Sequence, residues 1–188
     1  MFLSLNGICS SGIDICLVHA SRNGHLEVVK YLQQCKKNDD LLISSSSNGD
    51  LGSVKHLIEK CHEDVEAKDN GGRTPIICAS QNGHLEVVKY LHEECHADVE
   101  AMNNDGNTPI ICASYNGYLE VVKYLHEECH ANVEAKNRDG YTPIIIASCY
   151  GHLEVVKYLA EECHANVTDR AIRSTKNDEV RRYLQSKR

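Results

Sequence analysis

The sequence has little aromatic material for one large core. Its 188 residues include no Trp, one Phe and three Pro. Buried surface must therefore come from Val, Ile, Leu and Ala together with Cys and Tyr, side chains that suit thin helical layers better than a thick sandwich core. The scarcity of large aromatics favours many small cores over a single large one.

Long apolar runs are also missing. No stretch approaches the roughly 18 consecutive apolar residues that a membrane helix needs. The opening residues 1–5, Met-Phe-Leu-Ser-Leu, lack the positive charge and the extended apolar segment of a secretory signal. The sequence therefore predicts neither a membrane association nor a signal peptide.

Charge is distributed unevenly along the chain. The formal net charge is −7, but residues 168–188 hold seven Lys or Arg against three Asp or Glu, so this end is +4 and the rest is −11. An acidic body repels phosphate backbones, which argues against a nucleic-acid partner. The basic end, from Arg170 to Arg188, could form a small contact patch, but we favour a solvated final helix.

Ten cysteines raise the question of a disulfide framework. Four of them recur at intervals of 34 residues: Cys61, Cys95, Cys129 and Cys163. Equivalent positions in stacked helices lie about 8–10 Å apart, whereas a disulfide requires Cα atoms within about 7 Å. We therefore predict free thiols and a cytoplasmic or nuclear location, since these compartments are reducing.

The same period of 34 residues runs through most of the chain. Thr-Pro-Ile-Ile occurs three times, beginning at Thr74, Thr108 and Thr142. A fixed period of this length is typical of stacked supersecondary units, none of which can bury its apolar face alone. The predicted fold class is an all-α solenoid of helix-turn-helix units.

Each full unit is predicted to contain a tight turn, two helices and a loop. In the third unit, Asp-Asn-Gly-Gly before Arg73 suits a hairpin turn, because Asn and Gly tolerate a positive φ. Thr-Pro then begins a short helix over 75–81, since Pro in the first turn has no N–H to leave unpaired. A second helix begins at Leu85, with Lys89 and Glu93 placed as an exposed i, i+4 ion pair.

The repeat divides the chain into five units and a cap. We expect an N-terminal segment and then a single repeat domain, with these bounds: 1–12 for the segment, 13–37, 38–68, 69–102, 103–136 and 137–168 for the units, and 169–188 for the cap. The first two units are closer together than the others, which indicates that a hairpin is missing between them. The Ser-rich run at 44–47 is in register with a first helix, so we prefer a helix to a flexible linker there.

The run from Asp69 to Val88 resembles the ankyrin repeat. It reads Asp-x-x-Gly-x-Thr-Pro, then Ala, then Gly-His-Leu-Glu-Val-Val. The resemblance covers nearly the whole chain after residue 12. It implies helix pairs joined by short β-hairpin loops, and a surface that binds protein partners.

Two positions depart from the family pattern. The family usually has a backbone-bonded His where this chain has Ile77 and its equivalents, and Ile cannot make those hairpin bonds. It also usually has Gly at the end of the second helix, where this chain has Cys-His and one added residue. Because His tolerates a positive φ better than most residues, we expect His96, His130 and His164, or a neighbour of each, to adopt one.

The Cys-His pairs invite a zinc or nucleophile hypothesis. A structural zinc site needs four ligands that converge on one point, whereas these pairs recur once per layer without a Cys-x-x-Cys. The chain also lacks a Walker loop, a Gly-x-Ser-x-Gly elbow and a dinucleotide fingerprint. We therefore expect no catalytic residue, no cofactor and no metal, and a protein that is not an enzyme.

Comparison of the copies separates constant positions from variable ones. Residues 82–101 and 116–135 differ at only two positions. Variation gathers at the hairpin and at the end of the first helix, which line the concave, partner-binding surface in the ankyrin family. These positions and their neighbours are the predicted contact residues: Arg73, Gln81, Asn107, Tyr115, Asn116, Arg138, Tyr141 and Tyr150. Copies that drift wherever packing leaves them free would vary in the same way, so both explanations stay open.

The sequence as a whole predicts a non-catalytic scaffold, a monomer that binds a protein partner through its concave face. An alternative is the targeting segment of a larger regulator, suggested by the lack of an obvious capping helix before Ile13. A third hypothesis is self-association through the first unit.

Overall fold

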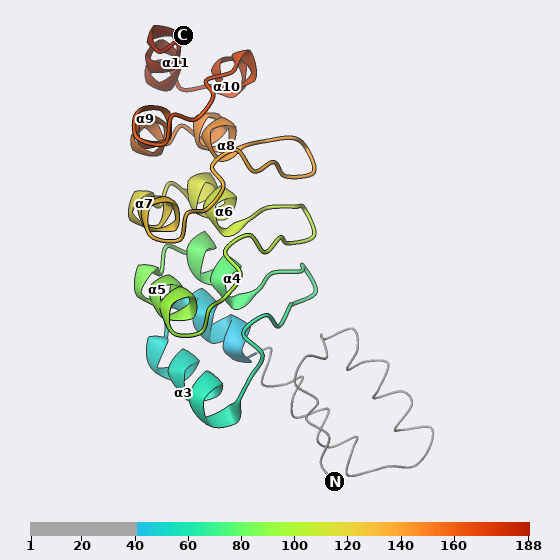
Figure 1. Ribbon diagram of the computed structural model, residues 1–188. Helices are drawn as coiled ribbons and strands as arrows, with labels where there is room; N and C mark the ends of the chain where they lie inside the picture. The colour runs from blue at the N-terminus through green and yellow to red at the C-terminus, as the bar shows by residue number, and fades with distance from the viewer. Residues whose placement is uncertain (1–40) are drawn as a thin grey trace, which may run out of the picture.

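The computed structural model describes residues 41–188, which form a stack of helical pairs (Figure 1). Residues 41–48 are helical, as predicted for the Ser-rich run. The helices that follow within the described range are α3 (Leu51–Cys61), α4 (Pro75–Gln81), α5 (Leu85–Glu93), α6 (Pro109–Asn116), α7 (Leu119–Glu127), α8 (Pro143–Tyr150), α9 (Leu153–Glu161), α10 (Asp169–Ser174) and α11 (Asp178–Ser186). The predicted N-terminal segment, the first unit, the missing hairpin and residues 38–40 of the second unit lie outside the described residues.

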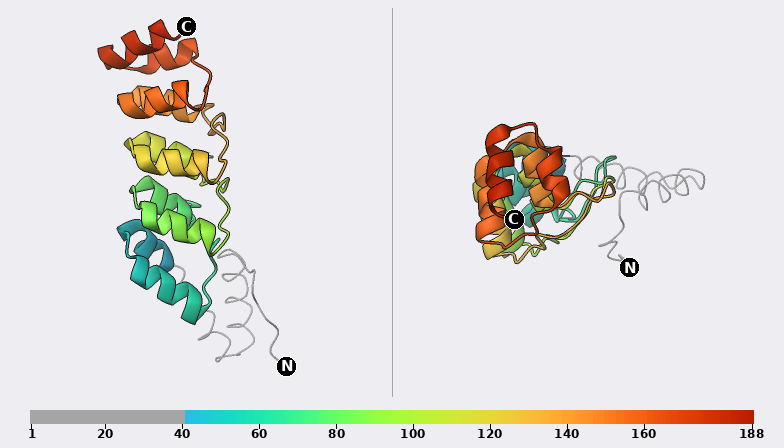
Figure 2. Two further views of the ribbon diagram at one scale, coloured as in Figure 1. Left: turned by 60° about the vertical axis from the view of Figure 1, so that its left-hand side comes forward. Right: turned by 90° about the horizontal axis from the view of Figure 1, so that it is seen from above.

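The first helices of the units, α4, α6, α8 and α10, stack in one row, and the second helices, α3, α5, α7, α9 and α11, stack in another. Figure 2 shows the layers following one another along a single axis, with the loops between units on one side. Each helix packs against the other helix of its layer and against its equivalents in neighbouring layers. The predicted all-α solenoid is confirmed. The hairpin loops form tight turns, and residues 41–188 contain no β-strand.

The first helices α4, α6 and α8 begin at Thr-Pro for a local reason. Thr74, Thr108 and Thr142 have extended backbones, and the Pro that follows occupies the first helical turn, where no intrahelical partner is lost. The prediction of a helix over 75–81 is confirmed by α4. The Thr-Pro anchor therefore sets the start of the helix in all three layers.

The core is a continuous apolar seam between the two rows of helices. In the layer of α6 and α7 it contains Ile110 and Ala113 from the first helix and Val122 and Leu125 from the second, all fully buried. Burying one such Ile or Leu side chain contributes about 1.5–3 kcal/mol. The equivalent residues of the next layer continue the same cluster, so stability arises between layers as much as within them.

Glycine ends the first helices and lies under the next layer. Gly83 and Gly117 have φ values of 78° and 79°, which side chains with a Cβ adopt at a cost. A Cβ on Gly83 would lie 2.5 Å from the ring of Tyr118, and one on Gly117 would lie 2.5 Å from the ring of His152. Backbone conformation and interlayer packing therefore both require glycine here.

The hairpin turns are held by Asp or Asn side chains. Oδ1 of Asp69 accepts hydrogen bonds from the backbone N–H of Gly71 (2.9 Å) and Arg73 (2.8 Å). Asn103 and Asn137 make the equivalent bonds in the next two layers. These side chains shape the turn without the His that the ankyrin family uses.

The Ile residues at that His position pack between layers instead. Ile77 forms a small buried cluster with Ala101 and Cys112. Ile111 forms the next cluster with Ala135 and Ile146. An apolar contact beneath the hairpins thus takes the place of the polar bonds that the substitution removes.

Tyr–Glu hydrogen bonds connect the second helices. The hydroxyl of Tyr124 donates to Glu93 at 2.9 Å, and that of Tyr158 donates to Glu127 at 2.8 Å. The predicted Lys89–Glu93 ion pair is wrong, because Glu93 turns toward Tyr124 in the next layer. Lys89 pairs with Glu86 at 3.0 Å instead.

Histidine adopts a left-handed backbone after α3, α5, α7 and α9, as predicted for the last three. The φ values are 56° for His96, 55° for His130 and 52° for His164, and His62 repeats the pattern at 58°.

No helix among residues 41–188 is long and apolar enough to cross a membrane.

Replacing His130 by Gly should raise the free energy of unfolding by about 1 kcal/mol, because Gly adopts a positive φ without the steric cost. Chemical denaturation measures the gain. His130→Ala is the matched control, since Ala removes the exposed ring and keeps the Cβ. An equal gain from Ala and Gly would show that the ring, rather than the backbone, is the source.

Tyr124→Phe should lower the free energy of unfolding by about 1 kcal/mol, since it removes a hydrogen bond to a carboxylate that is partly screened by solvent. Tyr90→Phe is the control, because the Tyr90 hydroxyl makes a longer bond of 3.2 Å to the exposed Glu59. Urea unfolding of both variants tests this. A loss for Tyr90→Phe as large as that for Tyr124→Phe would contradict it.

Candidate partner-binding surface

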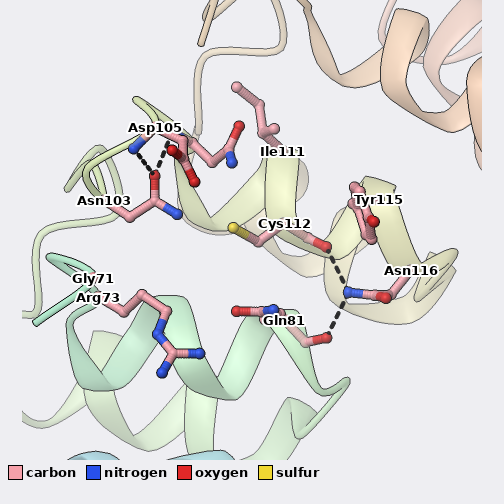
Figure 3. Close-up of a pocket in the computed structure, with 10 residues that line it drawn as sticks. Gly71, Arg73, Gln81, Asn103, Asp105, Ile111, Cys112, Tyr115 and Asn116 are labelled. Carbon is pink, nitrogen blue, oxygen red and sulfur yellow. Dashed lines mark hydrogen bonds between the residues drawn. The ribbon is translucent and has the colours of Figure 1, made fainter. Parts of the chain in front are cut away.

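A groove crosses the surface formed by the hairpins and the first helices, which we call the concave surface after its counterpart in the family. It has a volume of about 430 Å³ and lies between the layers of α4 and α6 (Figure 3). Five predicted contact residues line it: Arg73, Gln81, Asn107, Tyr115 and Asn116. The structure thus brings residues from two units to one place.

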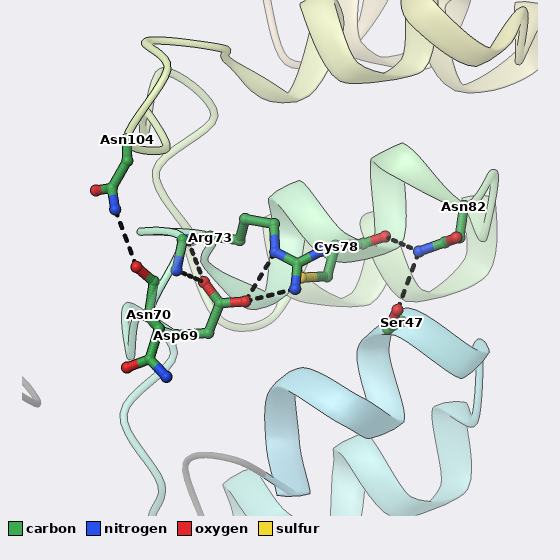
Figure 4. A network of polar contacts seen from close by, with 8 residues as sticks. Ser47, Asp69, Asn70, Arg73, Cys78, Asn82 and Asn104 are labelled. Atoms are coloured by element: carbon green, nitrogen blue, oxygen red, sulfur yellow. Dashed lines mark hydrogen bonds and ion pairs between the residues drawn. The ribbon is translucent and has the colours of Figure 1, made fainter.

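Arg73 is held in the groove by its own hairpin. Its Nη2 lies 2.6 Å and its Nε 2.7 Å from Oδ2 of Asp69 (Figure 4). Partial burial of Asp69 opposes ionisation, but the hydrogen bonds from Arg73 outweigh it and hold the pKa of this carboxyl below its usual range. Arg73 is therefore an oriented guanidinium rather than a freely moving one.

Two predicted contact residues also connect the layers. The Nδ2 of Asn116 donates to the backbone oxygen of Gln81 at 2.9 Å, which ties α6 to α4. The Oδ1 of Asn107 accepts from Asn137 in the next hairpin at 2.9 Å. One layer earlier, the Nδ2 of Asn82 donates to the side-chain hydroxyl of Ser47 at 3.0 Å, as Figure 4 shows. These amides hold the surface in shape as well as lining it.

An exposed aromatic pair extends from the groove, at Tyr115, to Tyr150 in the next layer. Tyr150 stands where earlier layers have an interlayer Asn, and its ring centroid lies 4.1 Å from that of Tyr115. Both rings are substantially exposed, 52% for Tyr150 and 42% for Tyr115. The interaction with the Tyr115 side chain is the main cause that raises the pKa of Tyr150.

The last two predicted contact residues, Tyr141 and Arg138, lie in the hairpin of the fifth unit. Tyr141 is half-buried, and the guanidinium carbon of Arg170 lies 4.0 Å from the centroid of its ring, a cation–π distance. Arg138 is exposed on the same hairpin, and its backbone N–H donates to Asp105 in the preceding one at 2.9 Å. The eight predicted residues therefore lie on one surface, but only five share the groove.

Among the polar side chains of this surface, sequence comparison missed Asn103, Asp105 and Arg170. Asn103 and Asp105 also line the groove. Position 105 varies between copies, being Gly in the preceding copy and Asp in the next, and this variation could have indicated Asp105. Arg170 contacts Tyr141 from the cap, where no hairpin copy exists for comparison.

The thiols at the groove are poorly suited to nucleophilic catalysis. Cys112 lines it, but burial raises the pKa of its thiol to about 12, and burial raises that of Cys78 to about 11. A thiol that stays protonated is a poor nucleophile. Residues 41–188 hold seven cysteines, all free, and contain no group of three or more His, Cys, Asp or Glu that could hold a metal ion.

The fold and the surface define a helical-repeat solenoid that displays side chains from rigid layers. A family model described as "Ankyrin repeats (3 copies)" matches residues 17–102, 41–137 and 92–171. The chain belongs to the ankyrin-repeat family, as the sequence resemblance predicted. Members of this family are generally protein–protein interaction modules and are typically not enzymes. No curated protein matches the chain.

Tyr115→Phe should lower the pKa of Tyr150 toward its ordinary value, because the hydroxyl whose interaction raises it is removed. A pH titration of Cζ-labelled tyrosine by NMR follows each hydroxyl separately. Tyr183→Phe, which changes a distant tyrosine of the cap, should leave Tyr150 unaltered. An unchanged Tyr150 titration in the Tyr115 variant would rule out the interaction.

Proposed function

We propose that this chain is a non-catalytic scaffold whose protein partner docks on the concave surface. The observation that carries the proposal is the groove of about 430 Å³, where five contact residues predicted from sequence variation meet. One of the five, Tyr115, also packs on the exposed ring of Tyr150. Tyr and Arg are the residue types that most often dominate binding energy at protein interfaces.

Rigidity of the surface supports high affinity from a small contact area. Asp69 orients Arg73, and Asn116 fixes the position of α6 relative to α4. Side chains that are already ordered lose little conformational entropy when a partner binds. The mechanism we propose is therefore display of a preformed surface, with little change of shape.

The remaining features of the proposal rest on chemistry. The high pKa of the Cys112 thiol supports a role without catalysis. The unpaired state of the seven described cysteines supports a reducing compartment, the cytoplasm or the nucleus. The acidic body of the chain supports a protein partner rather than a nucleic acid. We propose that the scaffold acts as a monomer.

The test is a quantitative pull-down from lysate of the native cell with three forms of the chain. A concave variant carries Gln81→Ala, Tyr115→Ala and Tyr150→Ala, and it keeps Arg73 because that side chain holds the hairpin. A partner should be recovered by the wild type and reduced at least about tenfold with the concave variant, since hot-spot truncations cost 2 kcal/mol or more.

The matched control carries three substitutions on the second helices: Lys89→Ala, Lys123→Ala and Lys157→Ala. These lysines occupy equivalent positions and make exposed ion pairs at 2.9–3.0 Å, which contribute little to stability. The control should recover the partner as the wild type does. Equal loss with both variants, or with neither, would refute docking on the concave surface.

A further inference from the structure

Three tyrosines of the concave surface form a row that ends at the cap. The rings of Tyr115 and Tyr150 lie 4.1 Å apart. Tyr141 belongs to the same unit as Tyr150, and the guanidinium carbon of Arg170 lies 4.0 Å from the ring centroid of Tyr141. This tyrosine row spans the fourth and fifth units and reaches the basic end of the chain.

A hollow of about 410 Å³ lies at the cap end of the row, lined by Tyr141, Arg170, Arg173 and Ser174. Arg170 is positioned there by the last hairpin, since its Nη2 donates to the backbone oxygen of Asp139 at 2.9 Å. Its Nη1 lies 3.4 Å from the backbone oxygen of Gly140. A guanidinium has five N–H groups, so the two bonds fix its plane and leave donors for a ligand.

Arg173 supplies a second positive charge to the hollow, and its nearest carboxylate neutralises that charge only partly. Its side chain is 80% exposed, and its ion pair with Asp169 is long, 3.5 Å. Asp169 also pairs with Arg188 at 2.5 Å, so one carboxylate serves two guanidinium groups. An added carboxylate can therefore approach Arg173 and Arg170 with favourable electrostatics.

We infer that the tyrosine row and the hollow dock a short acidic segment of a partner protein. The segment places an Asp or Glu against Arg170 and Arg173 and an apolar side chain on Tyr115 and Tyr150. Layers lie about 8–10 Å apart and an extended chain covers about 3.3 Å per residue, so about six residues span the two layers. This inference rests on the proposed function and adds the chemistry of the partner.

The charge distribution favours a polypeptide over a polyphosphate. Residues before 168 carry a net charge of −11, which would repel a strand that bears one charge per nucleotide. One or two carboxylates at the end of a largely apolar segment need only the local positive charge of Arg170 and Arg173. The apolar remainder of the segment matches the exposed tyrosine rings, which offer large contact areas.

The experiment begins with selection of phage-displayed random twelve-residue peptides on the full chain. Enriched peptides should combine Asp or Glu with an apolar residue about six positions away. The best sequence is then synthesised with a fluorescein label, together with a version in which Gln and Asn replace Glu and Asp. Fluorescence anisotropy compares the two peptides on wild-type and variant chains.

Arg173→Gln should weaken the acidic peptide about fivefold or more, because it removes half of a charge-assisted site. Arg182→Gln is the matched control, since it removes the same charge from an exposed cap position that does not line the hollow. It should change affinity less than about twofold. With the neutral peptide, Arg173→Gln should have no further effect, which isolates the carboxylate–guanidinium contact.

The outcomes separate the inference from the proposed function. Enriched peptides that require Tyr115 and Tyr150 but contain no excess of Asp or Glu would overturn the inference and support the concave scaffold. Equal effects of Arg173→Gln and Arg182→Gln would also overturn the inference. So would labelled oligouridylate that binds the wild-type chain more tightly than the acidic peptide does and loses that affinity with Arg173→Gln. Selection of no peptide that depends on the tyrosines would overturn both.

Discussion

Burial between layers is the constraint on which the whole structure depends. A single helical pair leaves residues such as Ile110 and Leu125 with too little cover, and the next layer supplies it. Hydrogen bonds then fix how each layer sits on the last, through Tyr124 and Glu93 on the second helices and through Asn104 and Gly71 at the hairpins. Apolar contact provides most of the energy, and these polar contacts define the geometry.

The concave surface follows from that division of roles. Interlayer amides such as Asn116 keep neighbouring first helices in register, and the residue beside them is free to vary. In the fifth unit Tyr150 replaces the amide, so an interlayer bond is exchanged for an exposed ring that packs on Tyr115. A position that is structural in two layers thus becomes part of the displayed surface in the third.

The fold was largely predictable, and the details of the surface were not. The Thr-Pro anchors gave the start of each first helix, and the φ preference of His identified His96 and its equivalents. The partner of Lys89 was missed because a donor in the next layer, the Tyr124 hydroxyl, engages Glu93, and one helix considered alone does not contain that donor. The Arg170–Tyr141 contact was missed because the cap has no hairpin copy for comparison.

The glycines that end the first helices give the stack a direction. Gly83 is covered by Tyr118 and Gly117 by His152, so the cover always comes from the layer that follows in the chain. On the ribosome, each layer remains incomplete until about one further repeat of 34 residues has emerged. During synthesis, the most recently folded layer therefore keeps one uncovered apolar face until the next repeat emerges. The cap buries Val180 and Leu184 and turns charged residues outward, so it covers the face that the fifth unit leaves open.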